Sequence, residues 1–92
     1  MDPVLTVCIA SYNKSDLTYN LVKSILKNPN PKLAVSVVDN ASTDNTVDKL
    51  HEIEDDRFRL KVNDDNIGGP ANFVGAIYSC GGGIPFIATT GI

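Results

Sequence analysis

Apolar and polar positions along the chain follow strand and helix periods in turn. Short apolar runs rich in β-branched residues are typical of buried strands, and segments with a helical apolar period separate them. The predicted strands are residues 4–10, 33–38, 57–62 and 84–88. The predicted helices are residues 16–27, 45–54 and 70–79. Strands that alternate with crossover helices predict a parallel sheet with right-handed connections.

The predicted helices carry start and stop signals. Ser15 is a candidate N-cap for the first helix, and residues 42–44 (Ser-Thr-Asp) supply candidate caps for the second. The Asn-Pro-Asn-Pro sequence at residues 28–31 ends the first helix. Pro70 suits the first position of the third helix, because its missing N–H has no partner to lose there.

The third predicted strand indicates the order of the sheet. Its apolar and cationic residues alternate, with Phe58, Leu60 and Val62 on one side and Arg57, Arg59 and Lys61 on the other. One wet face and cationic side chains are typical of an edge strand. We therefore expect an α/β three-layer sandwich with a mainly parallel four-stranded sheet in the order 3-2-1-4, resembling half of a Rossmann-like domain.

Composition narrows the class of protein. The 92 residues predict one small domain, and a net charge of −3 with no basic patch excludes a nucleic-acid partner. No apolar run approaches the roughly 20 residues that span a bilayer. Cys8 and Cys80 lie in apolar surroundings without a metal or redox spacing, so we expect two reduced thiols. Reduced thiols and the lack of a signal-peptide pattern predict a cytoplasmic location, either free or at the cytoplasmic face of a membrane.

Candidate ligand-binding residues follow the predicted strands. Parallel sheets bind ligands beyond the carboxyl ends of their strands, where we expect Tyr12 and Asp39 to lie close together. An aromatic ring could stack on a nucleobase, and a carboxylate could accept a hydrogen bond from an imide N–H. The alternatives are that Tyr12 packs on the first helix and that Asp39 caps the second helix or bonds to loop amides. Ser11 and Asn13 border the same crevice.

The turn before the third predicted helix is a second candidate. Gly68 and Gly69 could let backbone N–H groups approach a phosphate, or could serve a turn that needs positive φ. Asn72 could reach the same ligand, or be a solvated helix position. The sequence contains no GxGxxG, GxxxxGK[ST] or GxSxG motif, which disfavours a dinucleotide cofactor, a P-loop and a nucleophile elbow. A phospho-acceptor role for Asp39 is weak, since residues 4–10 supply no acidic partner.

Three segments resemble the opening of family 2 glycosyltransferases in content, order and spacing. They are Val4–Asn13, Val37–Asp44 and Asn66–Gly69, and the resemblance covers essentially the whole chain. It implies a GT-A fold and transfer of a sugar from a UDP-, GDP- or dTDP-sugar to an acceptor hydroxyl, usually with inversion. It also implies that Ser11 and Tyr12 border the nucleoside, that Asp39 holds the base, and that the loop from Asn66 lies along the nucleotide.

The chain also departs from this family. The family holds Mg²⁺ or Mn²⁺ with a DxD motif at the end of the fourth strand, where residues 87–92 read Ile-Ala-Thr-Thr-Gly-Ile. The family's general base and acceptor-binding half lie further along. We therefore expect residues 1–92 to be the nucleotide-sugar-binding half of a truncated domain, inactive as this chain, without catalytic residues, metal ligands or a cofactor of its own. The alternative is a non-catalytic α/β module that self-associates through the edge of strand 84–88.

Overall fold

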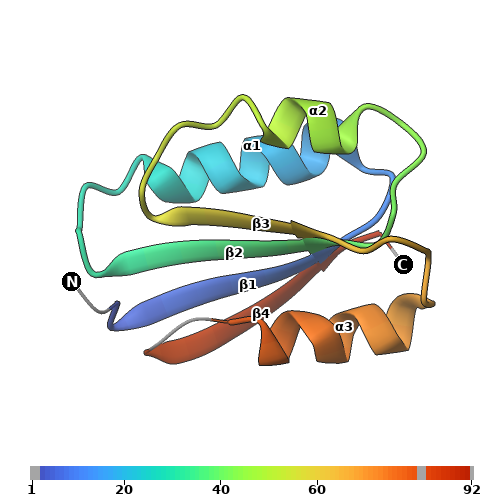
Figure 1. Cartoon of the computed structure of the whole chain (residues 1–92). Helices are drawn as coiled ribbons and strands as arrows, with labels where there is room; N and C mark the ends of the chain where they lie inside the picture. Colours follow the sequence, from blue (N-terminus) through green and yellow to red (C-terminus); the bar gives the residue numbers. More distant parts are fainter. Residues whose placement is uncertain (1–2, 81–82, 92) are drawn as a thin grey trace.

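The fold is a four-stranded parallel sheet between two layers of helices (Figure 1). The computed structural model describes residues 3–80 and 83–91. Its elements are β1 (Leu5–Ser11), α1 (Ser15–Leu26), β2 (Leu33–Asp39), α2 (Thr46–Leu50), β3 (Phe58–Val62), α3 (Gly69–Tyr78) and β4 (Ile84–Thr90). The strand order is β3-β2-β1-β4, which confirms the predicted order. Helices α1 and α2 cover one face of the sheet, and α3 covers the other.

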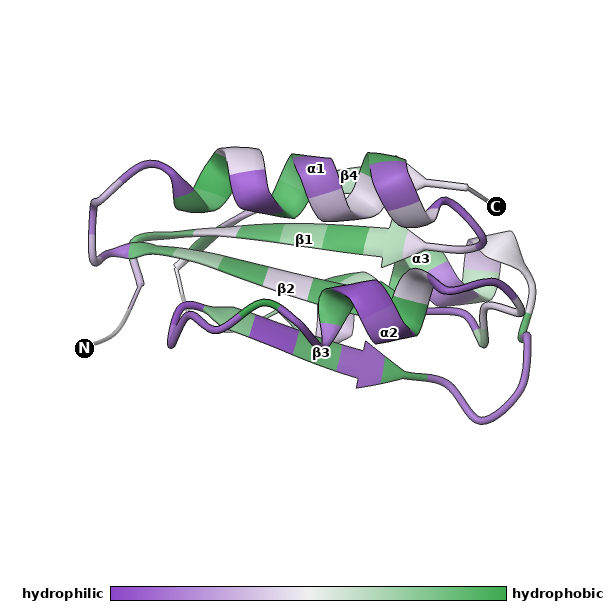
Figure 2. Cartoon of the chain, turned by 90° about the horizontal axis from the view of Figure 1, so that it is seen from above, coloured by the Kyte–Doolittle hydropathy of each residue, from purple (hydrophilic) through white to green (hydrophobic). Residues whose placement is uncertain are grey.

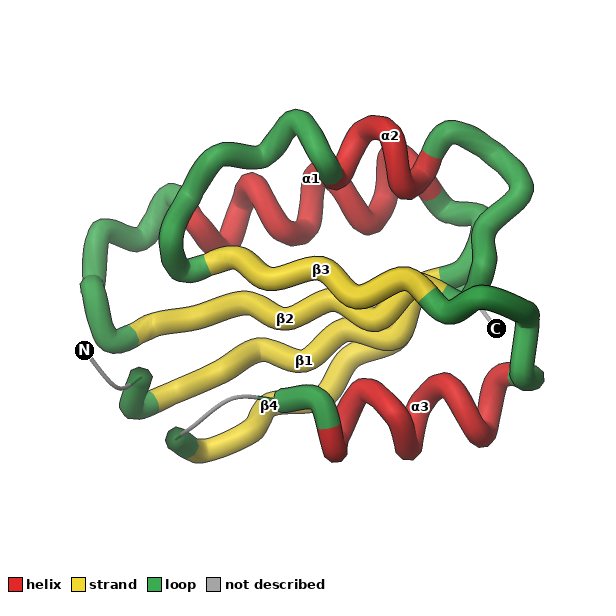
Figure 3. The backbone as a smooth tube through the Cα atoms, in the orientation of Figure 1, coloured by secondary structure: helices red, strands yellow, loops and turns green. Residues whose placement is uncertain are grey.

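The register aligns the carboxyl ends of the strands. Ser11 pairs with Asp39 on one side and with Thr90 on the other, and Asp39 pairs with Val62. The loops that follow β1, β2 and β3 therefore gather at one end of the sheet (Figure 3). This is the end where ligands bind in open parallel sheets.

The two faces of the sheet differ in the size of their apolar clusters. Side chains two residues apart on a strand point to the same face. On the α1 and α2 side, six buried residues form the main core: Val7, Ile9, Val22, Val35, Val37 and Leu50. On the α3 side the buried apolar cluster consists of Ala10, Val38 and Ala76. The first layer is therefore held by larger side chains than the second.

β3 forms one edge of the sheet, as its sequence predicts. Phe58 and Leu60 are half-buried against the core, while Arg59 and Lys61 are exposed. This alternation appears as bands of opposite hydropathy along β3 (Figure 2). The wet face and the two cations protect the edge from pairing with another strand.

The predicted start of the first helix and the predicted end of the second helix are wrong. Ser15 is the first residue of α1, and the N-cap is Lys14, because Asn13 turns the chain with φ 49° and Thr18 N already donates to Lys14 O at 2.9 Å. α2 ends at Leu50, not at residue 54, because Glu52 N and Ile53 N bond to carbonyls only three residues back, in a tight turn.

The predicted cap of the second helix is only partly present. Asn45 is the N-cap of α2 and makes no capping bond with its side chain. Asp44, one of the predicted candidates, accepts a hydrogen bond from Thr46 N at 2.9 Å.

The expectation of two reduced cysteines is wrong, because Cys8 and Cys80 form a disulfide. Their Cα atoms lie 5.8 Å apart, within the usual range for a disulfide. The bond joins the middle of β1 to the chain just after α3, and the 72-residue separation hides this proximity from the sequence. A cytoplasmic location therefore loses the support that reduced thiols supplied.

The sequence predicts no segment long and apolar enough to span a bilayer. Within residues 3–80 and 83–91, no helix combines the length and apolar character needed to cross a membrane.

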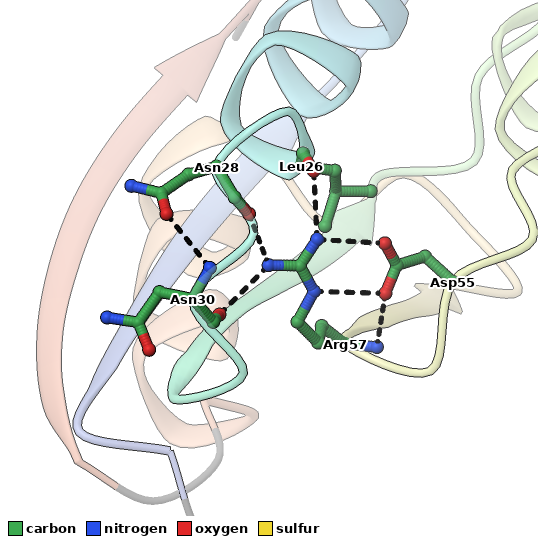
Figure 4. A network of polar contacts seen from close by, with 5 residues as sticks. All are labelled: Leu26, Asn28, Asn30, Asp55 and Arg57. Carbon is green, nitrogen blue, oxygen red and sulfur yellow. Dashed lines mark hydrogen bonds and ion pairs between the residues drawn. The ribbon is translucent and has the colours of Figure 1, made fainter.

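Arg57 organises the opposite end of the sheet (Figure 4). Its guanidinium donates to the carbonyl oxygens of Leu26 at 2.8 Å, Asn28 at 2.6 Å and Asn30 at 3.0 Å. It also pairs with the Asp55 carboxylate at 3.0 Å. The last carbonyls of a helix have no partner within the helix, so Arg57 satisfies the end of α1 and holds the turn that leads to β2.

Candidate functional site

A pocket of ≈ 200 Å³ lies at the carboxyl ends of the strands, on the α3 side. It is lined by Ala10, Tyr12, Asn40, Gly69, Pro70, Asn72, Phe73, Thr89 and Gly91. Its wall is mainly apolar, and none of the lining residues is charged. Three residues predicted for the site, Tyr12, Gly69 and Asn72, are in this lining.

Asp39 lies beside the pocket but is closed off from it. Its carboxylate is fully buried and accepts hydrogen bonds from Ser42 N at 2.8 Å and Ser42 Oγ at 2.6 Å. Asp39 therefore bonds to a loop amide, as one of the alternatives supposed. The backbones of Tyr12 and Asp39 do come together, since Asp39 pairs with Ser11 in the sheet. A contact between Asp39 and a base stays a prediction.

Ser11 belongs to a buried chain of hydroxyl groups. Its Oγ lies 3.0 Å from Thr18 Oγ1, which lies 2.6 Å from Thr90 Oγ1. Because a hydroxyl can both donate and accept, the three groups can satisfy one another without water. They join the ends of β1 and β4 to α1, so Ser11 supports the strand ends rather than lining the pocket.

Asn13 and Gly91 shape the chain on either side of Tyr12. The Asn13 side chain accepts from Thr43 N at 2.8 Å, which fastens the loop after β1 to the loop after β2. Gly91 has φ +94°, and a Cβ there would lie 2.1 Å from Tyr12 O. Only glycine therefore fits at this approach.

Four asparagines connect the loops around the pocket, and we call them the asparagine network: Asn40, Asn63, Asn66 and Asn72. Asn63 Nδ2 donates to Asn40 Oδ1 at 3.2 Å and to Asn72 Oδ1 at 2.9 Å. Asn40 Nδ2 donates to Asn66 Oδ1 at 2.9 Å, and Asn72 Nδ2 donates to Val38 O at 3.2 Å. The network thus joins β2, the loop after β3 and the first turn of α3.

The glycine turn is part of the same arrangement. Gly68 has φ +87°, so it occupies the positive-φ turn that the sequence left as one alternative. Gly68 N donates to Asn66 Oδ1 at 2.8 Å, and Ile67 N donates to Asn40 Oδ1 at 2.9 Å. These two backbone N–H groups are therefore already bonded to side chains. Their contact with a nucleotide remains untested.

Sequence reasoning missed four prominent features of the pocket. Asn40 and Asn63 directly follow β2 and β3, and the sequence does not reveal that their side chains bond to each other. Pro70 and Phe73 line the pocket from the first turn of α3. The spacing of these two residues, three positions apart directly after a glycine pair, was an available signal, because such residues share a helix face.

The residues at the end of β4 do not fit a divalent cation. Thr90 is buried and its hydroxyl bonds to Thr18, whereas Mg²⁺ and Mn²⁺ prefer carboxylate ligands. In the part of the chain that the structure describes, no group of three or more His, Cys, Asp and Glu residues could hold a metal.

The parallel sheet and the pocket beyond its strand ends define an α/β domain of the Rossmann-like GT-A class. The family model for glycosyl transferase family 2 matches residues 6–89, so the chain belongs to this family.

A solved structure supports the same assignment. The chain is 28% identical to the mannosyltransferase PcManGT from Pyrobaculum calidifontis, and the two structures superpose with a TM-score of 0.79. The structure of PcManGT is a complex with GDP-Man and Mn²⁺. The similarity covers 97% of this chain and 28% of the mannosyltransferase chain. A comparison with curated proteins gives no match.

Proposed function

We propose that residues 1–92 are the nucleotide-sugar-binding half of a glycosyltransferase domain, and that the pocket takes the nucleoside of a UDP-, GDP- or dTDP-sugar. The observation that carries this proposal is the pocket itself, in which Tyr12 and Phe73 combine with two asparagine side chains at the strand ends. Membership of family 2 and the likeness to a protein whose structure is a complex with GDP-Man support it.

Tyr12 and Asp39 have different parts in this proposal. Tyr12 is half-buried in the pocket wall, and stacking of a base on its ring contributes about 1–3 kcal/mol. Each oxygen of the Asp39 carboxylate accepts one hydrogen bond from Ser42 and keeps a second lone pair. Because the side chain is fully buried, a base N–H reaches it only when the loop that holds Ser42 moves aside. The residues Ser11, Asn13, Asn66 and Gly68 support the loops that shape the pocket.

We further propose that this chain alone does not transfer sugar. Proton removal from an acceptor hydroxyl needs a positioned base, and a departing diphosphate needs charge neutralisation. The pocket lining contains neither a carboxylate nor a histidine. The chain spans 28% of the length of PcManGT.

Titration with UDP, GDP and dTDP tests the binding proposal, followed by calorimetry or by amide chemical shifts. We expect a binding signal for at least one of them, centred on residues of the pocket. Tyr12→Ala should weaken this binding by about 5- to 150-fold, the loss of one stacking contact. Tyr78→Ala is the matched control, because Tyr78 is 85% exposed and does not line the pocket. Absence of any signal at millimolar ligand contradicts the proposal.

A second function is supported by the outer edge of β4, which has no partner strand within the described residues. Ile84 and Phe86 are 68% and 61% exposed, which is unusual for large apolar residues of a strand. Ile84 N donates to Val4 O, and Tyr12 N donates to Thr90 O, so these positions of β4 bond to β1. Because backbone groups alternate along a strand, the C=O of Pro85 and the N–H and C=O groups of Ile87 and Thr89 point away from β1. This edge could pair with β4 of a second copy.

Light scattering at several concentrations tests self-association. A dimer mass in the wild type and a monomer mass in Phe86→Lys would support pairing through β4, since an added cation opposes edge pairing. Tyr78→Lys is the control, because it adds the same charge at an exposed position of α3, and it should keep the wild-type mass. A monomer at every concentration contradicts this function.

A further inference from the structure

We infer that the pocket recognises the nucleoside part of its ligand alone, so that the diphosphate and a divalent cation add little to affinity. This inference rests on the proposed nucleotide binding and names the portion of the nucleotide that the site is built for. It departs from what the family resemblance implies, because the residues at the metal position do not fit a metal.

Charged residues are unevenly distributed along the chain. The 8 Lys and Arg and the 11 Asp and Glu residues all precede Asn66, and residues 66–92 contain no charged side chain. Six of the nine lining residues come from this neutral segment. A diphosphate placed among neutral walls loses hydration without gaining a counter-charge, which is unfavourable. A neutral planar ring loses little in the same place and gains contact with Tyr12 and Phe73.

The carboxylate and hydroxyl groups near the pocket are not placed to hold a cation. A cation that bridges a diphosphate to protein needs carboxylate oxygens facing the ligand. The Asp39 carboxylate is buried and bonded twice to Ser42, and the Thr90 hydroxyl is bonded to Thr18. Thr89 is exposed in the pocket wall, but a single neutral hydroxyl does not replace a carboxylate.

The asparagines that line the pocket keep some neutral hydrogen-bonding capacity. Asn40 Oδ1 already accepts from Asn63 and Ile67, while Asn40 Nδ2 and Asn72 Nδ2 each use one of two N–H groups. Asn72 Oδ1 accepts one bond and keeps a second lone pair. The remaining neutral donors and acceptor match the edge of a base or the hydroxyls of ribose.

Lys14 is a cation beside Gly91, at the rim of this site. Its Cγ lies 3.0 Å from the position that a Cβ on Gly91 would take. Lys14 is exposed, so water and salt screen its attraction for a phosphate. Lys14→Ala therefore measures directly how much charge contributes to binding.

The experiment titrates uridine, guanosine and thymidine beside UDP, GDP and dTDP, each with Mg²⁺ and with a chelator. For the preferred base, we expect nucleoside and diphosphate to have dissociation constants within about 3-fold of each other, unchanged by Mg²⁺. Lys14→Ala should change the diphosphate constant by less than about 3-fold. Diphosphate binding that is more than about 10-fold tighter than nucleoside binding, or that requires Mg²⁺, overturns the inference.

A pair of adjacent variants separates ring contact from charge. Phe73→Ala should weaken nucleoside and diphosphate by the same factor, about 5-fold or more, while Val74→Ala, which is next to it but outside the lining, should change neither. Phe73→Ala that weakens the nucleoside but not the diphosphate overturns the inference. If none of the six compounds binds, the proposed function fails too, whereas binding of diphosphates alone contradicts only the present inference.

Discussion

The two faces of the sheet are covered by helix layers that are held in different ways. On the α1 and α2 face, valines, an isoleucine and a leucine form a continuous buried core. On the α3 face the buried apolar cluster contains two alanines and one valine. That smaller layer has a disulfide at one end of α3 and the asparagine network at the other.

The comparison shows why the pocket lies on the α3 side. Small side chains under a helix leave space at its end, and Ala10 is one wall of that space. Apolar side chains of α3 are also partly exposed to solvent, since Val74 and Ile77 are 49% and 41% exposed. The large core holds α1 and α2, whereas a disulfide and side-chain hydrogen bonds near its two ends hold α3 and permit a cavity beside it.

Reduction of the disulfide is the largest expected perturbation. A cross-link that closes a loop of this length typically stabilises a protein by about 2–4 kcal/mol. Urea unfolding with and without a dithiol reductant should show a loss of this size. The double variant Cys8→Ala with Cys80→Ala is the control and should not respond to the reductant. Equal stability of the wild type in both conditions would show that α3 does not depend on this bond.

A matched pair of valines on β2 compares the two faces directly. Val37 and Val38 are neighbours, both buried, and they point to opposite faces. Val37→Ala should cost about 2–3 kcal/mol, because it leaves a cavity among large side chains. Val38→Ala should cost about 1–2 kcal/mol, because its alanine neighbours offer fewer contacts to lose. Equal losses in denaturant titrations would contradict the difference between the faces.

A substitution at Gly75 is expected to stabilise the layer formed by α3. It lies inside α3, and a Cβ there would meet no atom within 4 Å. Gly75→Ala should therefore stabilise the protein by about 1 kcal/mol through helix propensity alone. Gly91→Ala is the contrasting variant and should destabilise, because its Cβ would collide with Tyr12 O. Thermal unfolding measures both, and a fall in melting temperature for Gly75→Ala would oppose the prediction.

Lowering the pH tests the ion pair between Arg57 and Asp55, which lies at the end of the sheet away from the pocket. The hydrogen bond from Arg57 lowers the pKa of Asp55 below its usual value of 3.8. A lowered folded-state pKa stabilises the protein above the unfolded-state pKa, and this is lost as pH falls below about 4 through the folded-state pKa. The contribution should be at most about 1 kcal/mol, because the pair is partly exposed.

Denaturant titrations between pH 7 and pH 2 check this contribution. Asp55→Asn should remove it, and Asp56→Asn is the control, since Asp56 makes no ion pair within the described residues. A pH dependence that Asp55→Asn leaves unchanged would contradict the assignment.

Much of the fold could be predicted from local patterns. The strands agree with the predicted ranges to within two residues, because β-branched runs and helix periods act over short distances. Alternation in β3 identified an edge of the sheet. α2 was predicted too long, since nothing local to residues 51–54 reveals the tight turns that follow Leu50.

The site divides in the same way. The sequence by itself determined that polar residues follow the strands, that residues 66–92 carry no charge, and that the end of β4 lacks a carboxylate. Only the tertiary structure decided which of these side chains remain available. It turned the Asp39 carboxylate toward Ser42, and it brought Cys8 to Cys80. It also joined four asparagines from the loop after β2, the loop after β3 and the first turn of α3. Hydrogen bonds and cross-links between distant segments depend on how the strands and helices pack, and local periodicity contains no record of that packing.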